Sequence, residues 1–177
     1  ITLHTASSAE SEAWWIAQEI RREVERGVSY DEIAVLFRTN FQSRALEEAF
    51  LHAEVPYRLL GTRFFDRKEV KDVLSWIRLA LDPTRESDRM RAVQAPTRGI
   101  GKVTLGKLAA GKRDELRATD KTKVAAFEKI VEELNALSET ATPSAFVKMV
   151  IEKSGMATAL LKEGEDGEER LQNAREL

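Results

Sequence analysis

An arginine that directly follows an apolar run is the residue of this chain best placed to do chemistry. The run Ile33–Phe37 has the length and composition of a buried strand, and Arg38 stands at its end, before a helical pattern. In open α/β sheets, ligands bind at the C-terminal ends of the strands. Because a guanidinium is permanently charged and its donors match phosphate oxygens, Arg38 is a candidate phosphate ligand, and Phe37 could stack on a nucleobase. The alternative is a surface arginine in a strand-to-helix loop.

A second candidate segment, Gly61–Lys68, combines a glycine, two aromatic residues and three cations in front of a capped helix. Helix N-termini attract anions, and aromatic side chains with arginine suit single-stranded nucleic acid. Arg63 and Arg67 are therefore candidate nucleic-acid ligands. The alternative is structural, with Phe64 or Phe65 packing as a hydrophobic staple on the following helix.

A third segment, Pro96–Thr104, places a Gly-Ile-Gly turn at the start of a helix and among basic residues. Glycines let backbone amides approach a phosphate closely, and the helix dipole favours the anion. A helix-hairpin-helix element binds the DNA backbone in this way, without recognising the base sequence. The candidate DNA-binding residues are Thr97, Arg98, Gly99, Ile100, Gly101, Lys102 and Thr104. The alternative is an ordinary helix-to-helix turn with Ile100 in the core.

One further segment, Gly106–Arg113, matches most of a P-loop pattern and is rejected. Arg113 stands where the magnesium-binding serine or threonine is required. No strand precedes the segment, which lies within a helical pattern.

The first part of the chain, residues 1–81, alternates strand and helix patterns. We expect strands at Ile1–Thr5, Ile33–Phe37 and Tyr57–Leu60, with helices after Ser7, over Ser43–Ala53 and from Asp66 to Leu81. Strands separated by helices of this length imply a parallel sheet.

The second part, residues 82–177, shows helical patterns and no convincing strand. These patterns cover Arg85–Val93, Val103–Arg117, Val124–Leu137, Pro143–Lys153 and a segment after Asp166. The predicted fold class is therefore α/β plus all-α, a partial parallel-sheet domain followed by a helical module.

Charge is unevenly distributed along the chain. Between Arg58 and Arg113 there are 14 basic and 6 acidic residues, whereas both flanking segments are acidic. A basic band of this kind suits a phosphate-rich partner, although a solvated helical surface explains it equally well. The chain has no cysteine and 2 histidines, which argues against a metal site, and no run approaches the roughly 20 apolar residues of a membrane helix.

Three segments stand in register along the chain: LFRTNFQSRALEEAF, VPYRLLGTRFFDRKEVKDVLSWIRL and APTRGIGKVTLGKL. In this order and near these spacings they resemble the UvrD/PcrA/Rep family of superfamily-one DNA helicases. The resemblance runs from Ile1 to Leu177 and is strongest between Ile33 and Leu108. The tail ERLQNAREL also resembles a helix of that family.

The resemblance implies an ATP-dependent DNA helicase that moves along single-stranded DNA, generally 3′ to 5′, and separates duplexes. ATP lies between two RecA-like domains in this family. Residues 1–81 would be the first half of the second RecA-like domain, and residues 82–177 the start of a mobile helical domain, inserted in it, that contacts duplex DNA.

The resemblance also suggests roles for individual residues. Arg38 falls on the family arginine that reaches the γ-phosphate, which makes it the candidate catalytic residue. Phe37 falls where the family commonly has a tyrosine near the adenine, so both residues are candidates for nucleotide binding. Thr97 and Gly99–Thr104 match the element thought to hold duplex phosphates.

The Walker A loop, the acidic magnesium-binding motif and the general base of the family do not occur among these 177 residues. We therefore expect ATP and Mg²⁺ to serve the parent enzyme, and the 177 residues alone to be inactive. The chain begins without methionine, which suggests a fragment of a longer protein.

The expected partners are single-stranded and duplex DNA, the remainder of the helicase chain and repair or replication proteins, with no membrane. The expected location is the cytoplasm, in association with the nucleoid. The alternative function is a stand-alone, non-catalytic module for DNA binding or protein interaction.

Overall fold

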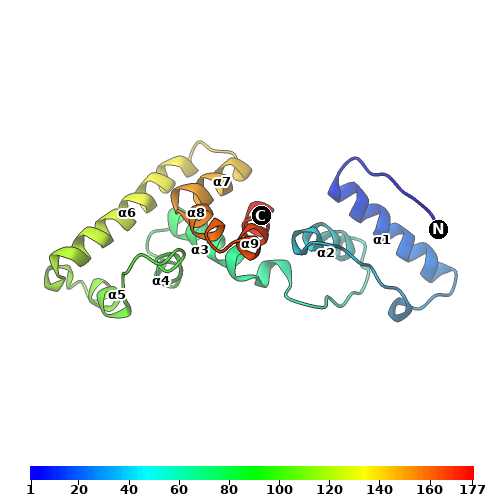
Figure 1. Ribbon diagram of the computed structural model, residues 1–177, viewed down its shortest axis with the longest axis horizontal. Helices are drawn as coiled ribbons and strands as arrows, with labels where there is room; N and C mark the ends of the chain where they lie inside the picture. The colour runs from blue at the N-terminus through cyan, green and yellow to red at the C-terminus, as the bar shows by residue number, and fades with distance from the viewer. The chain divides into compact units, whose positions relative to one another are not determined.

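The computed structural model describes residues 1–177 and contains helices but no β-strand (Figure 1). The chain forms two compact units. Unit 1 comprises Ile1–Arg67 with Glu176, and unit 2 comprises Lys68–Arg175 with Leu177. None of the helices combines the length and the apolar character needed to cross a membrane.

Unit 1 is built on two α-helices, α1 (Ala9–Glu25) and α2 (Ser43–His52). The Ser8 side chain caps α1 by accepting a hydrogen bond from the backbone N–H of Ser11. Apolar residues at helical spacing on both helices form a small core, and three short 3-10 helices connect the rest: η1 (Tyr30–Glu32), η2 (Asn40–Gln42) and η3 (Phe64–Asp66).

The predicted parallel sheet in the first part of the chain is wrong. Ile1–Thr5, Ile33–Phe37 and Tyr57–Leu60 all lack strand pairing, and the only bridge joins Gln94 to Thr97, in unit 2. Side chains along Ile33–Phe37 do alternate between half-buried and exposed, as in a strand. A strand also needs hydrogen-bonding partners for its backbone, however, and here the inward side chains of Ile33, Val35 and Phe37 pack on the helical core instead. Unit 1 is therefore helical with extended connections.

Unit 2 is all-helical, which confirms the prediction for residues 82–177. Its elements are α3 (Lys68–Leu81), α4 (Glu86–Ala92), α5 (Lys102–Ala109), η4 (Arg113–Glu115), α6 (Ala118–Ser138), α7 (Pro143–Lys153), α8 (Met156–Leu161) and α9 (Glu165–Arg175). Thr142 caps α7 in front of Pro143, and Gly155, which has a positive φ, follows the helix.

Helix α3 lies at the centre of unit 2. It packs against α4, α6, α7 and α9, and Trp76 and Leu79 on it are fully buried. The sequence pattern assigned this helix to the first part of the chain, whereas its side chains belong to the core of the second unit. The buried Glu69 on α3 accepts a hydrogen bond from Asn173 Nδ2 at 2.7 Å, which ties α9 to the same helix.

Candidate functional site

A basic turn between α4 and α5 presents the groups that suit a phosphate. Gln94 and Thr97 form a bridge across the turn, and Gln94 Nε2 donates to the carbonyl oxygen of Ile100 at 2.9 Å. Ile100 is 2% exposed and anchors the turn in the core. Ile100 thus packs in the core, as the structural alternative expected, and its side chain is not open to a ligand.

Among the residues of the turn, Gly99 is the one whose backbone conformation requires a glycine. Its φ is +66°, a conformation that other residues adopt only with strain. A Cβ atom there would also lie 3.0 Å from the amine of Lys123, which donates to the Gly99 carbonyl oxygen at 3.1 Å. Lys123 comes from α6, so a second element brings a cation to the turn.

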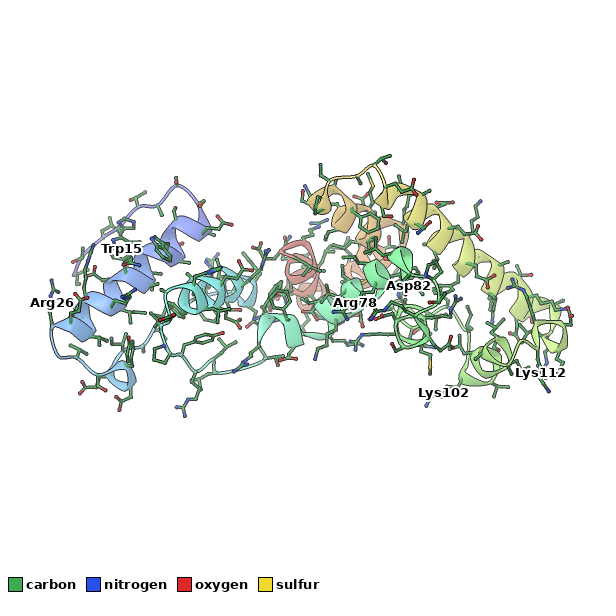
Figure 2. The ribbon with its side chains drawn as sticks, turned by 180° about the vertical axis from the view of Figure 1, so that it is seen from behind. Trp15, Arg26, Arg78, Asp82, Lys102 and Lys112 are labelled. Carbon is green, nitrogen blue, oxygen red and sulfur yellow. The ribbon has the colours of Figure 1, made fainter.

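The N-terminus of α5 opens toward solvent at this turn. Gly101 is its N-cap and offers no side chain to the first backbone N–H groups, which have no partner within the helix. Lys102 is exposed and points away from the other helices of unit 2, as Figure 2 shows. Exposed donors and a cation at a helix N-terminus can hold an anionic oxygen.

The remaining candidates of this segment differ in accessibility. Thr97 is exposed, and its hydroxyl lies 3.5 Å from the Gln94 carbonyl oxygen. Thr104 is buried, so its side chain is not open to a ligand. Arg98 is directed inward: its guanidinium donates to the carbonyl oxygens of Ala92 and Pro96 and lies over the Trp76 ring.

Arg38 lies in unit 1, exposed and in no ion pair of the structure. The Gln42 side chain fixes the backbone beside it, because Gln42 Oε1 accepts from the N–H of Arg38 at 3.2 Å and from the N–H of Thr39 at 3.1 Å. A fixed backbone carrying an unpaired guanidinium suits contact with an anion supplied from outside. Phe37 is half-buried against the helical core, which leaves only part of its ring accessible.

The two arginines of the Gly61–Lys68 segment are placed differently. Arg63 is exposed, as expected of a ligand-binding cation. Arg67 is 7% exposed; it donates to the Asn40 carbonyl oxygen at 2.6 Å and to Ser43 Oγ at 2.9 Å, and it lies over the Phe64 ring. Arg67 therefore joins this segment to η2 and to the start of α2. Phe64 is buried and Phe65 is about half exposed, at 52%.

The P-loop-like segment does not form a phosphate loop. Gly106 lies inside α5, and the chain continues as helix to Ala109. No group of three or more histidine, cysteine, aspartate or glutamate side chains is arranged to hold a metal ion.

Two residues that support the candidate sites, Gln42 and Lys123, were not predicted from the sequence. Gln42 could have been found, because Thr39-x-x-Gln42 has the spacing of a capping box, and the structure forms one there. Lys123 lies 24 residues after Gly99, and no local pattern connects the two.

A family model described as the UvrD-like helicase C-terminal domain matches residues 1–177. The chain is 36% identical to the DNA helicase II of Escherichia coli strain K12 over 195 residues, which cover 100% of this chain and 27% of that protein. It is 32% identical to the DNA helicase II of Haemophilus influenzae over 195 residues, with the same coverage of both chains. It is 38% identical to the ATP-dependent DNA helicase PcrA of Staphylococcus epidermidis over 109 residues, or 61% of this chain and 15% of that protein. The chain thus spans about a quarter of the length of the helicase II relatives.

We predict that Arg67→Lys loosens unit 1 although it keeps the charge. The ammonium cannot reproduce the guanidinium fork that reaches both Asn40 and Ser43. Amide hydrogen exchange within α2 should become roughly 10- to 100-fold faster, as expected for the loss of charge-assisted hydrogen bonds. The matched control is Arg63→Lys, an exposed arginine four residues earlier, which should leave the exchange rates unchanged. Equal exchange in both variants would show that Arg67 has no such role.

Proposed function

The chain belongs to the UvrD-like helicase C-terminal domain family, and from this premise we propose that it serves an ATP-driven DNA helicase in two ways. Its helical unit 2 contacts the backbone of duplex DNA, and its unit 1 supplies an arginine to a nucleotide held by the rest of the enzyme. The activity belongs to the longer protein, because this chain covers 27% of its helicase II relatives.

The exposed N-terminus of α5 is the observation that carries the DNA-binding proposal. Gly99 and Gly101 remove side-chain bulk on the approach, Lys102 adds an exposed charge, and the first amides of α5 are free to donate. None of these groups recognises a base. Contacts of this kind go to phosphate, give affinity without sequence preference and weaken as salt rises.

Arg38 is proposed to act on the nucleotide in trans. An exposed guanidinium with no ion pair can stabilise the charge that develops on a γ-phosphoryl group during transfer. The residues of this chain fit one side of such a site. We propose that the rest of the protein holds ATP and the ligands of Mg²⁺, and that Phe37 contributes the exposed part of its ring near the base.

Further features of the proposed function rest on the family alone. They are movement along single-stranded DNA in the 3′ to 5′ direction, a place in repair or replication with the proteins of those processes, and work in the cytoplasm at the nucleoid. For the single strand, Arg63 and the exposed Phe65 are better placed than the inward Arg67.

A second candidate is a stand-alone module that binds DNA or protein without catalysis. This function is favoured because the whole basic turn lies in unit 2, and unit 2 has its own hydrophobic core. The two functions differ in the need for Arg38: a binding module does not use it, whereas a helicase requires it for ATP hydrolysis.

We predict that Lys102→Ala weakens duplex binding by this chain through the loss of one phosphate contact. The slope of log affinity against log salt concentration should become shallower by about 1. The control is Lys148→Ala, an exposed lysine on α7 away from the turn, which should change neither affinity nor slope. Identical behaviour of the two variants in fluorescence anisotropy titrations would exclude Lys102 from the interface.

We predict that Arg38→Ala in the full-length enzyme lowers kcat for DNA-stimulated ATP hydrolysis by roughly 1,000-fold or more, as expected for an arginine that stabilises phosphoryl transfer. Arg58→Ala removes another exposed arginine of unit 1 and should leave kcat unchanged. The 177 residues alone should show no DNA-stimulated turnover. Normal hydrolysis by the Arg38→Ala enzyme would contradict the assignment.

A further inference from the structure

The Arg98 side chain is the most heavily engaged cation of unit 2. Its Nη1 atom donates to the carbonyl oxygens of Pro96 at 2.6 Å and Ala92 at 3.1 Å, and its Nη2 atom donates to the carbonyl oxygen of Ser154. These acceptors lie in the turn itself, in the last residue of α4 and just after α7. One side chain thus connects three separate backbone segments.

Two aromatic rings surround the same guanidinium. Its central carbon lies 4.7 Å from the centroid of the Trp76 ring, on α3, and 5.7 Å from that of Phe127, on α6. Both rings belong to fully or almost fully buried residues. Ring faces attract a cation, and a planar guanidinium stacks on them better than an ammonium does.

Arg98 is therefore poorly placed to bind a phosphate of DNA. Reaching one would break three hydrogen bonds to carbonyl oxygens and remove the cation from two rings, leaving the carbonyl group of the buried Ser154 without this donor. No carboxylate pairs with Arg98, and burial lowers its pKa to about 10. The group is still protonated at neutral pH, so its charge is available to the carbonyl oxygens and rings that surround it.

The segment held by Arg98 is the one that leads into the proposed DNA contact. Gly99 follows it directly, and Lys102 opens α5 three residues later. Trp76 reinforces the arrangement, since its Nε1–H donates to the Ala95 carbonyl oxygen at 2.6 Å. The backbone from Ala95 to Gly99 is thereby fixed on α3, α6 and the end of α7.

We propose that Arg98 is a positioning residue, which holds the Gly99–Lys102 turn in its DNA-binding geometry and does not itself contact DNA. The inference rests on the proposed function of the turn and deepens it. It corrects the direct DNA contact that the sequence suggested for this arginine. By holding the turn, Arg98 would offset the backbone freedom that its two glycines add, and such preorganisation lowers the ordering cost of association.

The test compares Arg98→Lys with Lys102→Ala in duplex-DNA titrations of the 177-residue chain over a range of salt concentrations. Arg98→Lys keeps the charge and loses the fork, so affinity should fall about 10-fold while the salt slope stays unchanged. Lys102→Ala should instead make the slope shallower by about 1. Retained wild-type affinity in Arg98→Lys, or a slope change equal to that of Lys102→Ala, would overturn the proposal.

Amide hydrogen exchange separates positioning from general destabilisation and does not depend on DNA. In Arg98→Lys, exchange should speed up by about 10-fold or more in residues 95–105 and remain unchanged in the C-terminal part of α6, around Leu134. Uniformly faster exchange across unit 2 would show that Arg98 stabilises the whole unit and does not position the turn in particular. Unchanged exchange would show that Arg98 does not hold the turn. If the unsubstituted chain fails to bind duplex DNA, the proposed function fails, while the exchange data still decide whether Arg98 holds the turn.

Discussion

The contact between Trp76 and the turn after α4 is the interaction on which unit 2 depends. The indole is fully buried on the central helix, donates to Ala95 and offers a ring face to Arg98. Its ring centroid lies 5.2 Å from that of Phe127, which extends the same cluster to α6. Because one apolar core holds both α3 and the turn, the backbone that faces solvent at Gly99–Lys102 is supported from inside. The core that stabilises the unit therefore also supports its candidate binding surface.

Three of the four candidate arginines, Arg38, Arg67 and Arg98, illustrate two uses of the same side chain. Arg38 is exposed, and only its backbone is fixed, by Gln42. Arg67 and Arg98 are directed inward, each donating to carbonyl oxygens of distant segments and each lying over an aromatic ring. An exposed guanidinium can serve a ligand that arrives from elsewhere. A guanidinium already engaged by the protein acts by holding backbone in place, and substitutions of the two kinds should have different consequences.

Local patterns in the sequence predicted what local forces determine. The helical pattern over Pro143–Lys153 placed α7 correctly, and the extended character of Ile33–Phe37 appears in its alternating exposure. Pairing of that segment into a sheet was predicted and is wrong, because pairing depends on partners that no single run specifies. The direction of Arg98 could not be predicted either, since its partner Ser154 lies 56 residues away. The sequence shows that a basic residue stands in the glycine turn, but the fold determines which groups that residue contacts.

The turn at the start of α5 is proposed to contact the phosphates of duplex DNA. A titration of the ¹⁵N-labelled chain with duplex DNA, followed through backbone amide chemical shifts, tests this contact. We expect saturable shifts at Gly99, Gly101 and Lys102, with the indole N–H resonance of Trp76 unmoved because the support beneath the turn stays in place. Saturable shifts confined to other surfaces, with these three amides unaffected, would contradict the proposed contact.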